Sequence, residues 1–287
     1  MTTNFRLSLK FWGVRGSIPT PIKENMRYGG NTLCIEVRLP SDEILVFDGG
    51  TGIRGLGDLL MDENENKGLN VRVFLTHFHW DHIQGIPFFR PLYAPDNRVI
   101  FHTPRISHLR KEDTGADGGA EGILSGQFSN PYFPVSFEFL LAKKEFVELD
   151  LQPTKFGDLT ISPFLLNHLG GAFGYRIESE GAVIVYATDL EHGDKELDKT
   201  VREYSQNADL LIFDSQYTPE DYEAHKGWGH STWQEACKVA NECQVKQLVL
   251  FHHKPSYDDA KLDQIAEEAS REFENVSCAR EGDSVIL

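Results

Sequence analysis

The chain has 287 residues, and its 28 Lys and Arg against 44 Asp and Glu give a formal net charge of −16. Such a surface repels nucleic acid phosphates, so binding to long DNA or RNA is not expected. The hydrophobic fraction of 40% is that of an ordinary globular protein, and no stretch approaches the roughly 18 apolar residues that a membrane helix needs. The N-terminal residues lack the continuous apolar segment of a secretory signal, and the four cysteines have no CxxC spacing. We therefore expect a cytoplasmic protein.

The first ninety residues have the pattern of strands and tight turns. Apolar, β-rich runs predict strands within 7–14, 32–39, 43–50 and 70–77, and Pro-Ser-Asp between the second and third signals a hairpin. Residues 50–63 have helical apolar spacing, and a further helix is expected at 82–89.

The composition changes between about residues 103 and 134, where glycines and acidic residues are followed by aromatic residues. Such a stretch is more typical of a mobile insertion over a site than of a core element. It could serve as a substrate lid or as a dimer contact.

After this insertion, strand and helix patterns alternate. Strands are predicted within 159–168, 174–189, 208–217, 245–253 and 283–287, and helices within 194–206, 231–244 and 257–274. With no internal repeat and no linker, residues 1–287 are expected to form one domain. The order of elements predicts an α/β fold in which two packed sheets carry helices on their outer faces.

Four polar side chains crowd the stretch LTHFHWDHIQG directly behind an apolar strand: His77, His79, Asp81 and His82. The first two are two residues apart, so on a strand end their side chains point the same way. A buried polar cluster is costly unless something pairs with it. Imidazole and carboxylate are ligands of zinc, iron or manganese, so this pattern favours a metal site over a hydrogen-bonded turn.

Three other apolar runs end on the same kinds of residue. His168 ends LLNH, Asp189 ends VIVYATD, and His252 and His253 end LVLFHH. These repeated strand-end positions indicate that the residues belong to the same metal site, with either His252 or His253 as the ligand of the last run.

This set of motifs resembles the metallo-β-lactamase superfamily over nearly the full length of the chain. The resemblance implies an αββα sandwich with two divalent metal ions where the sheets meet, Zn²⁺ first and Mn²⁺ or Fe as alternatives. It selects His252, and it implies that Asp48 supports the histidine loop from behind. The implied ligands are His77, His79 and His168 for one metal, Asp81, His82 and His252 for the other, and Asp189 as a bridge.

A second motif, His230-Ser231-Thr232, resembles the His-Ser-Thr motif of the tRNase Z branch and its cyclic phosphodiesterase relatives. Ser231 and Thr232 are good helix caps, so His230 is expected just ahead of a helix N-terminus. In that branch the histidine touches the scissile phosphate and can donate a proton. His230 is therefore predicted to bind substrate and to be catalytic, as is Asp81, although a purely structural role beside a cap is the alternative.

Two metals a few ångströms apart can hold a bridging hydroxide and an oxyanion at once. His168 and Asp189 are only 21 positions apart, which leaves no room for the tRNA-gripping arm of some tRNase Z enzymes, and FDSQYT departs from that branch's His-Glu-Ala-Thr. We predict a phosphodiesterase for a small or cyclic phosphodiester, such as a cyclic nucleotide or a cyclic ribose phosphate. A lactonase or thioesterase, a ribonuclease on short RNA ends, and a metal-binding sensor without activity are the alternatives.

Two loops, GVRGSIPTP and RYGGNT, could add contacts to a small anionic substrate. Arg15 and Asn31 are the candidates, although turn chemistry explains the glycines of these loops equally well. The family resemblance also implies a homodimer.

Overall fold

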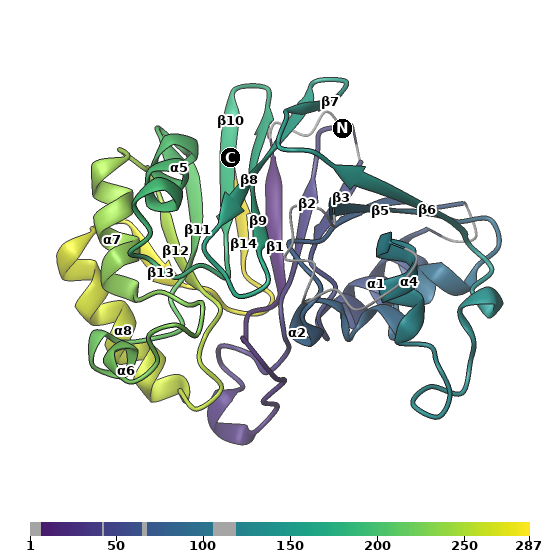
Figure 1. The fold of residues 1–287 in the computed structure, drawn as a ribbon, viewed down its shortest axis with the longest axis horizontal. Helices are drawn as coiled ribbons and strands as arrows, with labels where there is room; N and C mark the ends of the chain where they lie inside the picture. The colour runs from purple at the N-terminus through teal and green to yellow at the C-terminus, as the bar shows by residue number, and fades with distance from the viewer. Residues whose placement is uncertain (1–6, 42, 65–67, 106–118) are drawn as a thin grey trace.

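The computed structural model describes residues 7–41, 43–64, 68–105 and 119–287. Within them the chain forms two seven-stranded sheets that pack face to face, with helices on both outer surfaces (Figure 1). The predicted α/β architecture, an αββα sandwich of two mixed sheets, is confirmed. No helix in these ranges has both the length and the apolar character needed to cross a membrane.

The first sheet has the order β14-β1-β2-β3-β4-β5-β6. Neighbours from β14 to β3 are antiparallel and those from β3 to β6 are parallel. The helices of this half are α1 (Ile53–Glu63), α2 (Trp80–Ile83) and α4 (Gly119–Gly126), with 3₁₀ turns η1 (Lys23–Asn25), η2 (Ile86–Phe88), η3 (Arg90–Tyr93) and η5 (Phe137–Phe139). The strands are β1 (Ser8–Gly13), β2 (Cys34–Arg38), β3 (Ile44–Phe47), β4 (Asn70–Phe74), β5 (Arg98–Pro104), β6 (Lys143–Leu149) and β14 (Ser284–Ile286).

The second sheet has the order β13-β12-β11-β10-β9-β8-β7. Here β10 to β13 are parallel, and β7 to β10 form antiparallel hairpins. The strands are β7 (Thr154–Phe156), β8 (Leu159–Leu166), β9 (Ala172–Ser179), β10 (Ala182–Ala187), β11 (Leu210–Asp214), β12 (Leu248–Phe251) and β13 (Val276–Cys278). The helices are α5 (Lys195–Ser205), α6 (Pro219–Glu223), α7 (Trp233–Glu242) and α8 (Asp259–Glu272).

The core has three apolar layers because the central strands are buried on both faces. Along β3, Leu45 and Phe47 face the other sheet, whereas Ile44 and Val46 face α1. Phe47 lies opposite Phe74 in the parallel ladder of β3 and β4, and the two rings stack at 5.2 Å. A third layer packs the second sheet against α5, α7 and α8. These layers hold both sheets rigidly, so the strand ends present loops at fixed positions.

Two strands of the first sheet, β5 and β6, were not predicted. β6 is the edge strand and reads KKEFVEL, and its charges, typical of exposed edges, hide the apolar alternation. The expected insertion at 103–134 overlaps the end of β5, and its described part includes α4. Residues 106–118 lie outside the described residues.

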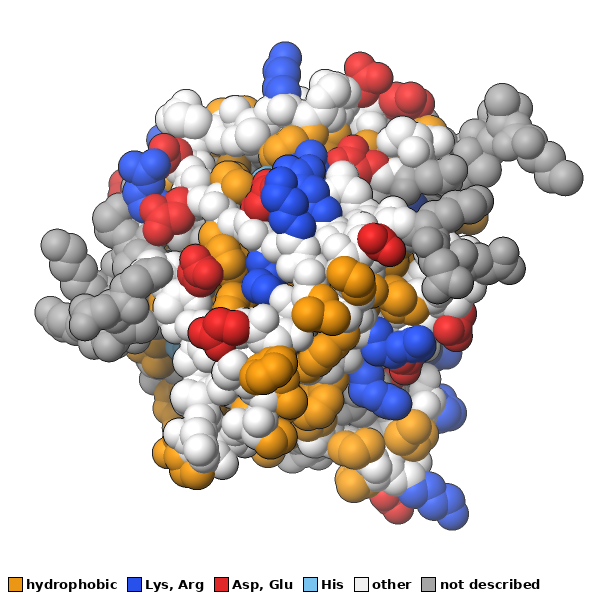
Figure 2. Space-filling model, turned by 90° about the vertical axis from the view of Figure 1, so that its right-hand side faces the viewer, with side chains coloured by type: hydrophobic (Ala, Val, Ile, Leu, Met, Phe, Trp, Pro, Cys, Tyr) orange, Lys and Arg blue, Asp and Glu red, His pale blue; other side chains and the backbone are white. Residues whose placement is uncertain are grey.

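Hydrophobic side chains also gather on part of the surface. Figure 2 shows them in the lower half of the face that forms the right-hand side of Figure 1, the side on which α4 lies. The segment after α4 has three exposed apolar side chains, Tyr132, Phe139 and Leu141. These residues are distant in sequence from every predicted metal ligand.

Candidate metal centre

The polar side chains that close the apolar runs meet where the ends of both sheets come together. His77 follows β4 in the first sheet, while His168, Asp189 and His252 follow β8, β10 and β12 in the second. The carboxyl ends of parallel strands share one sheet edge, and loops there commonly carry functional groups. All seven predicted ligands lie in two groups whose ligand atoms are within 4.8 Å of one another.

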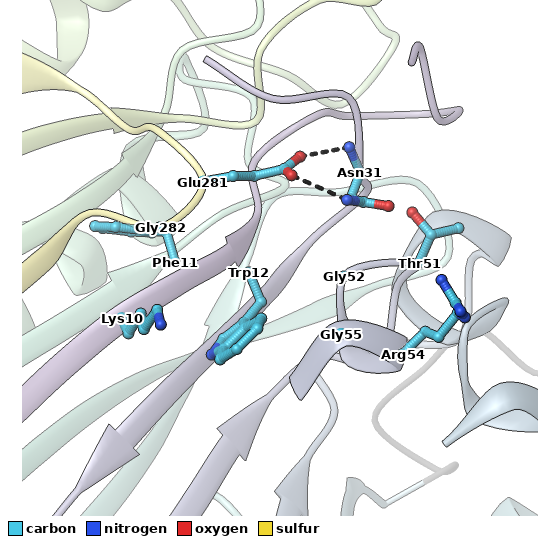
Figure 3. A pocket seen from close by; sticks show the side chains of 10 residues that line it. All are labelled: Lys10, Phe11, Trp12, Asn31, Thr51, Gly52, Arg54, Gly55, Glu281 and Gly282. Atoms are coloured by element: carbon cyan, nitrogen blue, oxygen red, sulfur yellow. Dashed lines mark hydrogen bonds between the residues drawn. The ribbon is translucent and has the colours of Figure 1, made fainter. Parts of the chain in front are cut away.

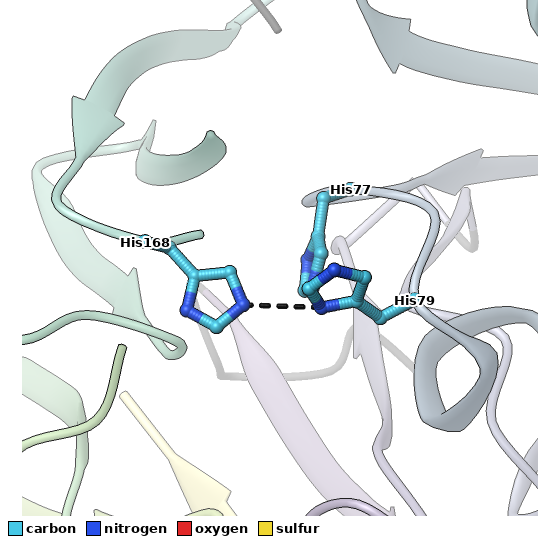
Figure 4. A group of neighbouring side chains, drawn as sticks. All are labelled: His77, His79 and His168. Carbon is cyan, nitrogen blue, oxygen red and sulfur yellow. Dashed lines mark hydrogen bonds between the residues drawn. The ribbon is translucent and has the colours of Figure 1, made fainter. Parts of the chain in front are cut away.

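The first group contains His77, His79 and His168 (Figure 4). His168 reaches across from the second sheet, and its Nε2 lies 3.1 Å from Nδ1 of His79. One detail of the prediction was wrong, because β4 ends at Phe74 and the two other histidines lie on the loop leading into α2. The turn of this loop, not strand alternation, makes their side chains converge.

The second group contains Asp81, His82, Asp189 and His252. Asp189 Oδ2 is 3.1 Å from His82 Nε2, and its Oδ1 is 3.2 Å from His252 Nε2. The same Oδ1 is 3.7 Å from His168 Nε2 and 3.9 Å from His77 Nε2. Asp189 therefore lies between the two groups, at the position that a bridging ligand needs. His253 lies outside them and bonds through Nε2 to the carbonyl of Ala279.

A buried network behind the cluster orients the histidines. The Asp48 carboxylate is 2.9 Å from His82 Nδ1 and accepts hydrogen bonds from the Thr76 amide at 2.9 Å and the Tyr186 hydroxyl at 2.8 Å. The Thr76 hydroxyl also lies 3.0 Å from Nδ1 of His77. With Nδ1 engaged, the Nε2 atoms of His77 and His82 are directed toward Asp189 in the cluster, an arrangement that metal-binding histidines commonly have. The expected supporting position of Asp48 is confirmed.

Two glycines let loops close onto the ligands. The carbonyl of Gly229 accepts a hydrogen bond from Nδ1 of His168 at 2.8 Å, and a Cβ at Gly229 would lie 2.5 Å from that nitrogen. A Cβ at Gly16 would lie 2.2 Å from Nδ1 of His252. The next residue, Ser17, donates its amide to Oδ2 of Asp81 at 2.7 Å. Larger side chains at either glycine would push these loops off the cluster.

Three residues at the strand ends hold left-handed backbone conformations. Asp48, Asp189 and His252 have φ values of 62°, 59° and 63°, which non-glycine residues rarely adopt. Strained positions of this kind cost on the order of 1–3 kcal/mol each and tend to occur at functional sites. This backbone conformation turns the side chains of Asp48, Asp189 and His252 toward the cluster where their strands end.

The donor atoms present fit a divalent metal. The buried Nε2 atoms of His77, His82 and His252 have no hydrogen-bond partner among the described residues. Imidazole nitrogens left unpaired beside two buried carboxylates are costly unless a cation binds them. A set of nitrogen and carboxylate donors without thiolate suits Zn²⁺, Mn²⁺ or Fe.

The buried carboxylates also set the protonation of the histidines. Burial alone would lower the pKa of His252, but the charge of Asp189 and contacts with Asp189 and Asp81 raise it to about 10. Burial also acts to lower the pKa of His82, but the charges of Asp189 and Asp48 outweigh it and raise this pKa well above its ordinary value. Burial lowers the pKa of His77 well below its ordinary value and that of His168 to about 4. Metal ligands bind deprotonated, so a cation entering the cluster would displace protons from His82 and His252.

His230 lies beside the second group, held by a carboxylate that the sequence analysis did not single out. Its Nδ1 is 2.9 Å from Oδ2 of Asp214, and its ring stacks on that of His252 at 4.6 Å. Asp214 also accepts the backbone amides of Asp189 at 3.0 Å and Ser231 at 3.1 Å. Asp214 closes the apolar run LLIFD of β11, so the strand-end signal that pointed to the candidate ligands would also have pointed to Asp214.

Arg15 does not reach the cluster, contrary to the expected substrate contact. It is fully buried, and its guanidinium donates to the carbonyls of Gly29 at 2.7 Å and Tyr257 at 2.6 Å. Burial lowers its pKa. A side chain enclosed in this way fastens two loops together and cannot meet a ligand.

Asn31 is likewise held away from the cluster. Its side-chain amide donates to Glu281 at 2.9 Å in a cavity of about 370 Å³ that Trp12 and Arg54 also line (Figure 3). This cavity contains none of the clustered histidines or aspartates. The side chain of Asn31 is therefore engaged in fixing the C-terminal segment to the first sheet.

The chain matches a known family over most of its length. A family model described as the beta-lactamase superfamily domain matches residues 45–253. Ribonuclease Z of Pyrococcus furiosus is 28% identical over 290 aligned residues, which cover 86% of this chain and 86% of that protein. Ribonuclease Z of Thermoplasma acidophilum is 24% identical and covers 96% of this chain and 94% of its own length.

Solved structures share the fold at lower identity. The metallo-beta-lactamase fold protein YhfI from Bacillus subtilis has a TM-score of 0.72 at 19% identity and covers 99% of this chain and 100% of its own. A diphosphatase from the PhnP family has a TM-score of 0.67 at 17% identity, covering 98% of each chain. The short form of human tRNase Z has a TM-score of 0.62 at 18% identity, covering 97% and 98%.

Proposed function

Because the chain belongs to the metallo-β-lactamase superfamily of metal-dependent hydrolases, we propose that it is a dinuclear phosphodiesterase acting on a small or cyclic phosphodiester. Cyclic nucleotides and cyclic ribose phosphates are examples of such substrates. The observation that carries the proposal is the pair of His230 and Asp214 beside the second ligand group, with Nδ1 and Oδ2 2.9 Å apart. Phosphodiester cleavage needs a proton for its alkoxide leaving group, and this pair can supply it.

Seven residues of the chain would hold the two metals. His77, His79 and His168 form one ligand set and Asp81, His82 and His252 the other, and Asp189 touches both. When bound, a pair of divalent metals supplies a nucleophile near neutral pH and neutralises charge on a phosphoryl oxygen.

The chain's own contribution is to place a proton donor with fixed orientation. Nδ1 of His230 donates to Asp214, so Nε2 is left to face a bound substrate. The Asp214 carboxylate favours the imidazolium form, in which Nε2 also carries a proton; that proton passes to the leaving oxygen and leaves a neutral imidazole. Asp214 is itself held by three backbone amides, those of Asp189, Gln216 and Ser231, which keeps the imidazole from rotating. The ordering of His230 before substrate arrives lowers the entropic cost of reaching the transition state.

The second candidate is a ribonuclease, which the ribonuclease Z relatives and the human tRNase Z structure favour. Two features support a small substrate over a long RNA. β9, β10 and the adjoining turns occupy the 20 residues between His168 and Asp189, and the chain carries a net charge of −16. A lactonase or thioesterase would make no comparable use of His230.

From the family resemblance we also propose that the protein is a cytoplasmic homodimer. Analytical ultracentrifugation, which gives the mass of the particle in solution, would test the dimer.

A substrate panel tests this assignment directly. The metal-loaded enzyme is expected to cleave a 2′,3′-cyclic nucleotide and a generic nitrophenyl phosphodiester faster than a lactone, a thioester or a short 3′-extended RNA. Initial rates at equal enzyme concentration would be compared, with chelated enzyme as the blank. Preference for the RNA would instead establish the ribonuclease, and preference for the lactone or thioester would remove the phosphodiesterase.

Metal content tests the dinuclear site independently of activity. We expect two transition-metal ions per chain in protein prepared without chelator, and protons should be released when stripped protein is reloaded, because His82 and His252 lose theirs. Elemental analysis would give the stoichiometry, and an indicator dye in weak buffer would give the protons. One ion or none after Zn²⁺, Mn²⁺ and Fe²⁺ have been offered would contradict the dinuclear site.

A further inference from the structure

Large apolar side chains stand exposed immediately beside the metal cluster. Trp80, between His79 and Asp81 in sequence, is 79% exposed, and Trp228, two residues before His230, is 60% exposed. Leu169, directly after His168, is 52% exposed. Their neighbours in sequence are proposed ligands or contact them, so the backbone of each of these exposed residues lies next to the cluster.

The contacts among the neighbours connect these three residues to one proposed ligand, His168. His79 Nδ1 lies 3.1 Å from His168 Nε2, and His168 Nδ1 bonds to the carbonyl of Gly229. In sequence, Trp80 follows His79, Leu169 follows His168, and Trp228 precedes Gly229. The two exposed tryptophans therefore come from different halves of the sandwich, one at the start of α2 and one in the turn after α6, and each is adjacent in sequence to a residue that contacts His168.

Trp228 is supported as a fixed surface. Its ring meets His225 edge to face at 5.0 Å, and His225 stacks on Tyr217 at 4.7 Å. Tyr217 in turn lies 6.0 Å from the ring of His230. A row of packed rings thus connects the exposed indole to the proposed proton donor.

The charges near the cluster indicate what these rings meet. In the segments 16–18, 78–84, 167–171, 188–192, 226–231 and 252–254, the only Lys or Arg residues are Lys226 and Lys254. Both are paired, Lys226 with Glu223 at 2.9 Å and Lys254 with Asp221 at 2.9 Å. Among the described residues of these segments, no Lys or Arg is without an acidic partner. Flat apolar side chains in such surroundings suit an uncharged ring attached to the reacting phosphate. They do not suit a nucleic acid chain, whose additional phosphates need cationic side chains.

We propose that Trp80 and Trp228 bind the base of a nucleoside phosphodiester by stacking, so that the enzyme selects phosphodiesters that carry a nucleobase. This inference rests on the proposed phosphodiesterase function and narrows it. Aromatic side chains stack on any base, so the selection is for a base and not for its identity. Of the two example substrate classes of the proposed function, cyclic nucleotides are accordingly expected to be preferred over cyclic ribose phosphates that lack a base.

Two esters with the same leaving group test the inference. Thymidine 5′-(4-nitrophenyl phosphate) and methyl 4-nitrophenyl phosphate both release 4-nitrophenolate when water adds to phosphorus, and they differ in the nucleoside. Trp80→Ala is expected to raise KM for the thymidine ester by about 5- to 100-fold and to change KM for the methyl ester less than about twofold. Trp80→Phe should retain much of the affinity, and Trp228→Ala should show the same selectivity as Trp80→Ala.

Tyr132→Ala is the matched control, because Tyr132 is an equally exposed aromatic residue, 85%, in the segment after α4. It should change neither KM. Metal content is measured for every variant, and Trp228→Ala decides the matter if Trp80→Ala loses metal. Equal effects of the tryptophan variants on both esters, or none, would overturn the stacking role while leaving the phosphodiesterase intact. Failure of the metal-loaded wild type to cleave either ester would overturn the proposed function and this inference with it.

Discussion

Asp189→Ala is expected to release at least one metal ion per chain and to abolish turnover while leaving the fold intact. Its carboxylate lies within 3.9 Å of Nε2 of four histidines, two from each ligand group. Removal of this carboxylate takes one donor from both proposed metals. The apolar layers of the core do not include Asp189, so the sandwich should persist.

Elemental analysis and circular dichroism of the same preparation would separate metal loss from misfolding. Asp209→Ala is the matched control, because Asp209 is also a buried aspartate of the second half but bonds to the Val183 amide and Lys246. It should retain both metals, even if the protein is less stable. Should Asp189→Ala keep both metals and near-normal activity, another residue would be the bridge.

The sequence analysis predicted which side chains meet at the cluster because their signal is simple. A polar residue that ends a buried apolar strand has few structural reasons to be there, and His168, Asp189 and His252 each stand at such a position. The parallel strands then bring these ends to one edge. Asp214 carries the same signal, but it lies in FDSQYT, a stretch that was compared only with the His-Glu-Ala-Thr motif, which it does not match.

The incorrect expectations have a different origin. Arg15 and Asn31 were judged from glycine-rich loops, and sequence does not show whether a loop side chain faces a ligand or fastens another loop. For Arg15 the partners are backbone carbonyls of residues as distant as Tyr257, and these leave no mark in the local sequence. The strand β6 was missed because its exposed edge position favours charged residues. The exposure of Trp80 could not be predicted either, because its position between two candidate ligands does not show which way its side chain points.

The second large effect is expected from His230→Ala, which should leave the metal content unchanged and slow the cleavage of poor leaving groups by about 10²- to 10⁴-fold. His230 belongs to neither of the two proposed ligand sets, and its Nδ1 is engaged by Asp214. An alkoxide such as a ribose hydroxyl must be protonated as it leaves. A nitrophenolate leaves without a proton, so nitrophenyl esters should lose much less activity.

Rate constants for a 2′,3′-cyclic nucleotide and for a nitrophenyl diester would be compared in wild type and variant, with metal analysis of each. Asp214→Asn is the companion variant, because it keeps the volume but weakens the hydrogen bond that orients His230. It should show the same dependence on leaving group with a smaller loss in kcat and little change in KM. A structural role of Asp214 would instead lower both rates together.

The pattern of loss across the two substrates decides what His230 does. A selective loss for the cyclic nucleotide identifies a proton donor, because only that leaving group needs one. A uniform loss for both substrates means that His230 binds the phosphate without giving up a proton. No loss with both metals retained would remove His230 from the reaction. Since the pair of His230 and Asp214 is the feature that separates phosphodiester cleavage from ester cleavage at this site, that result would favour a lactonase or thioesterase over the phosphodiesterase.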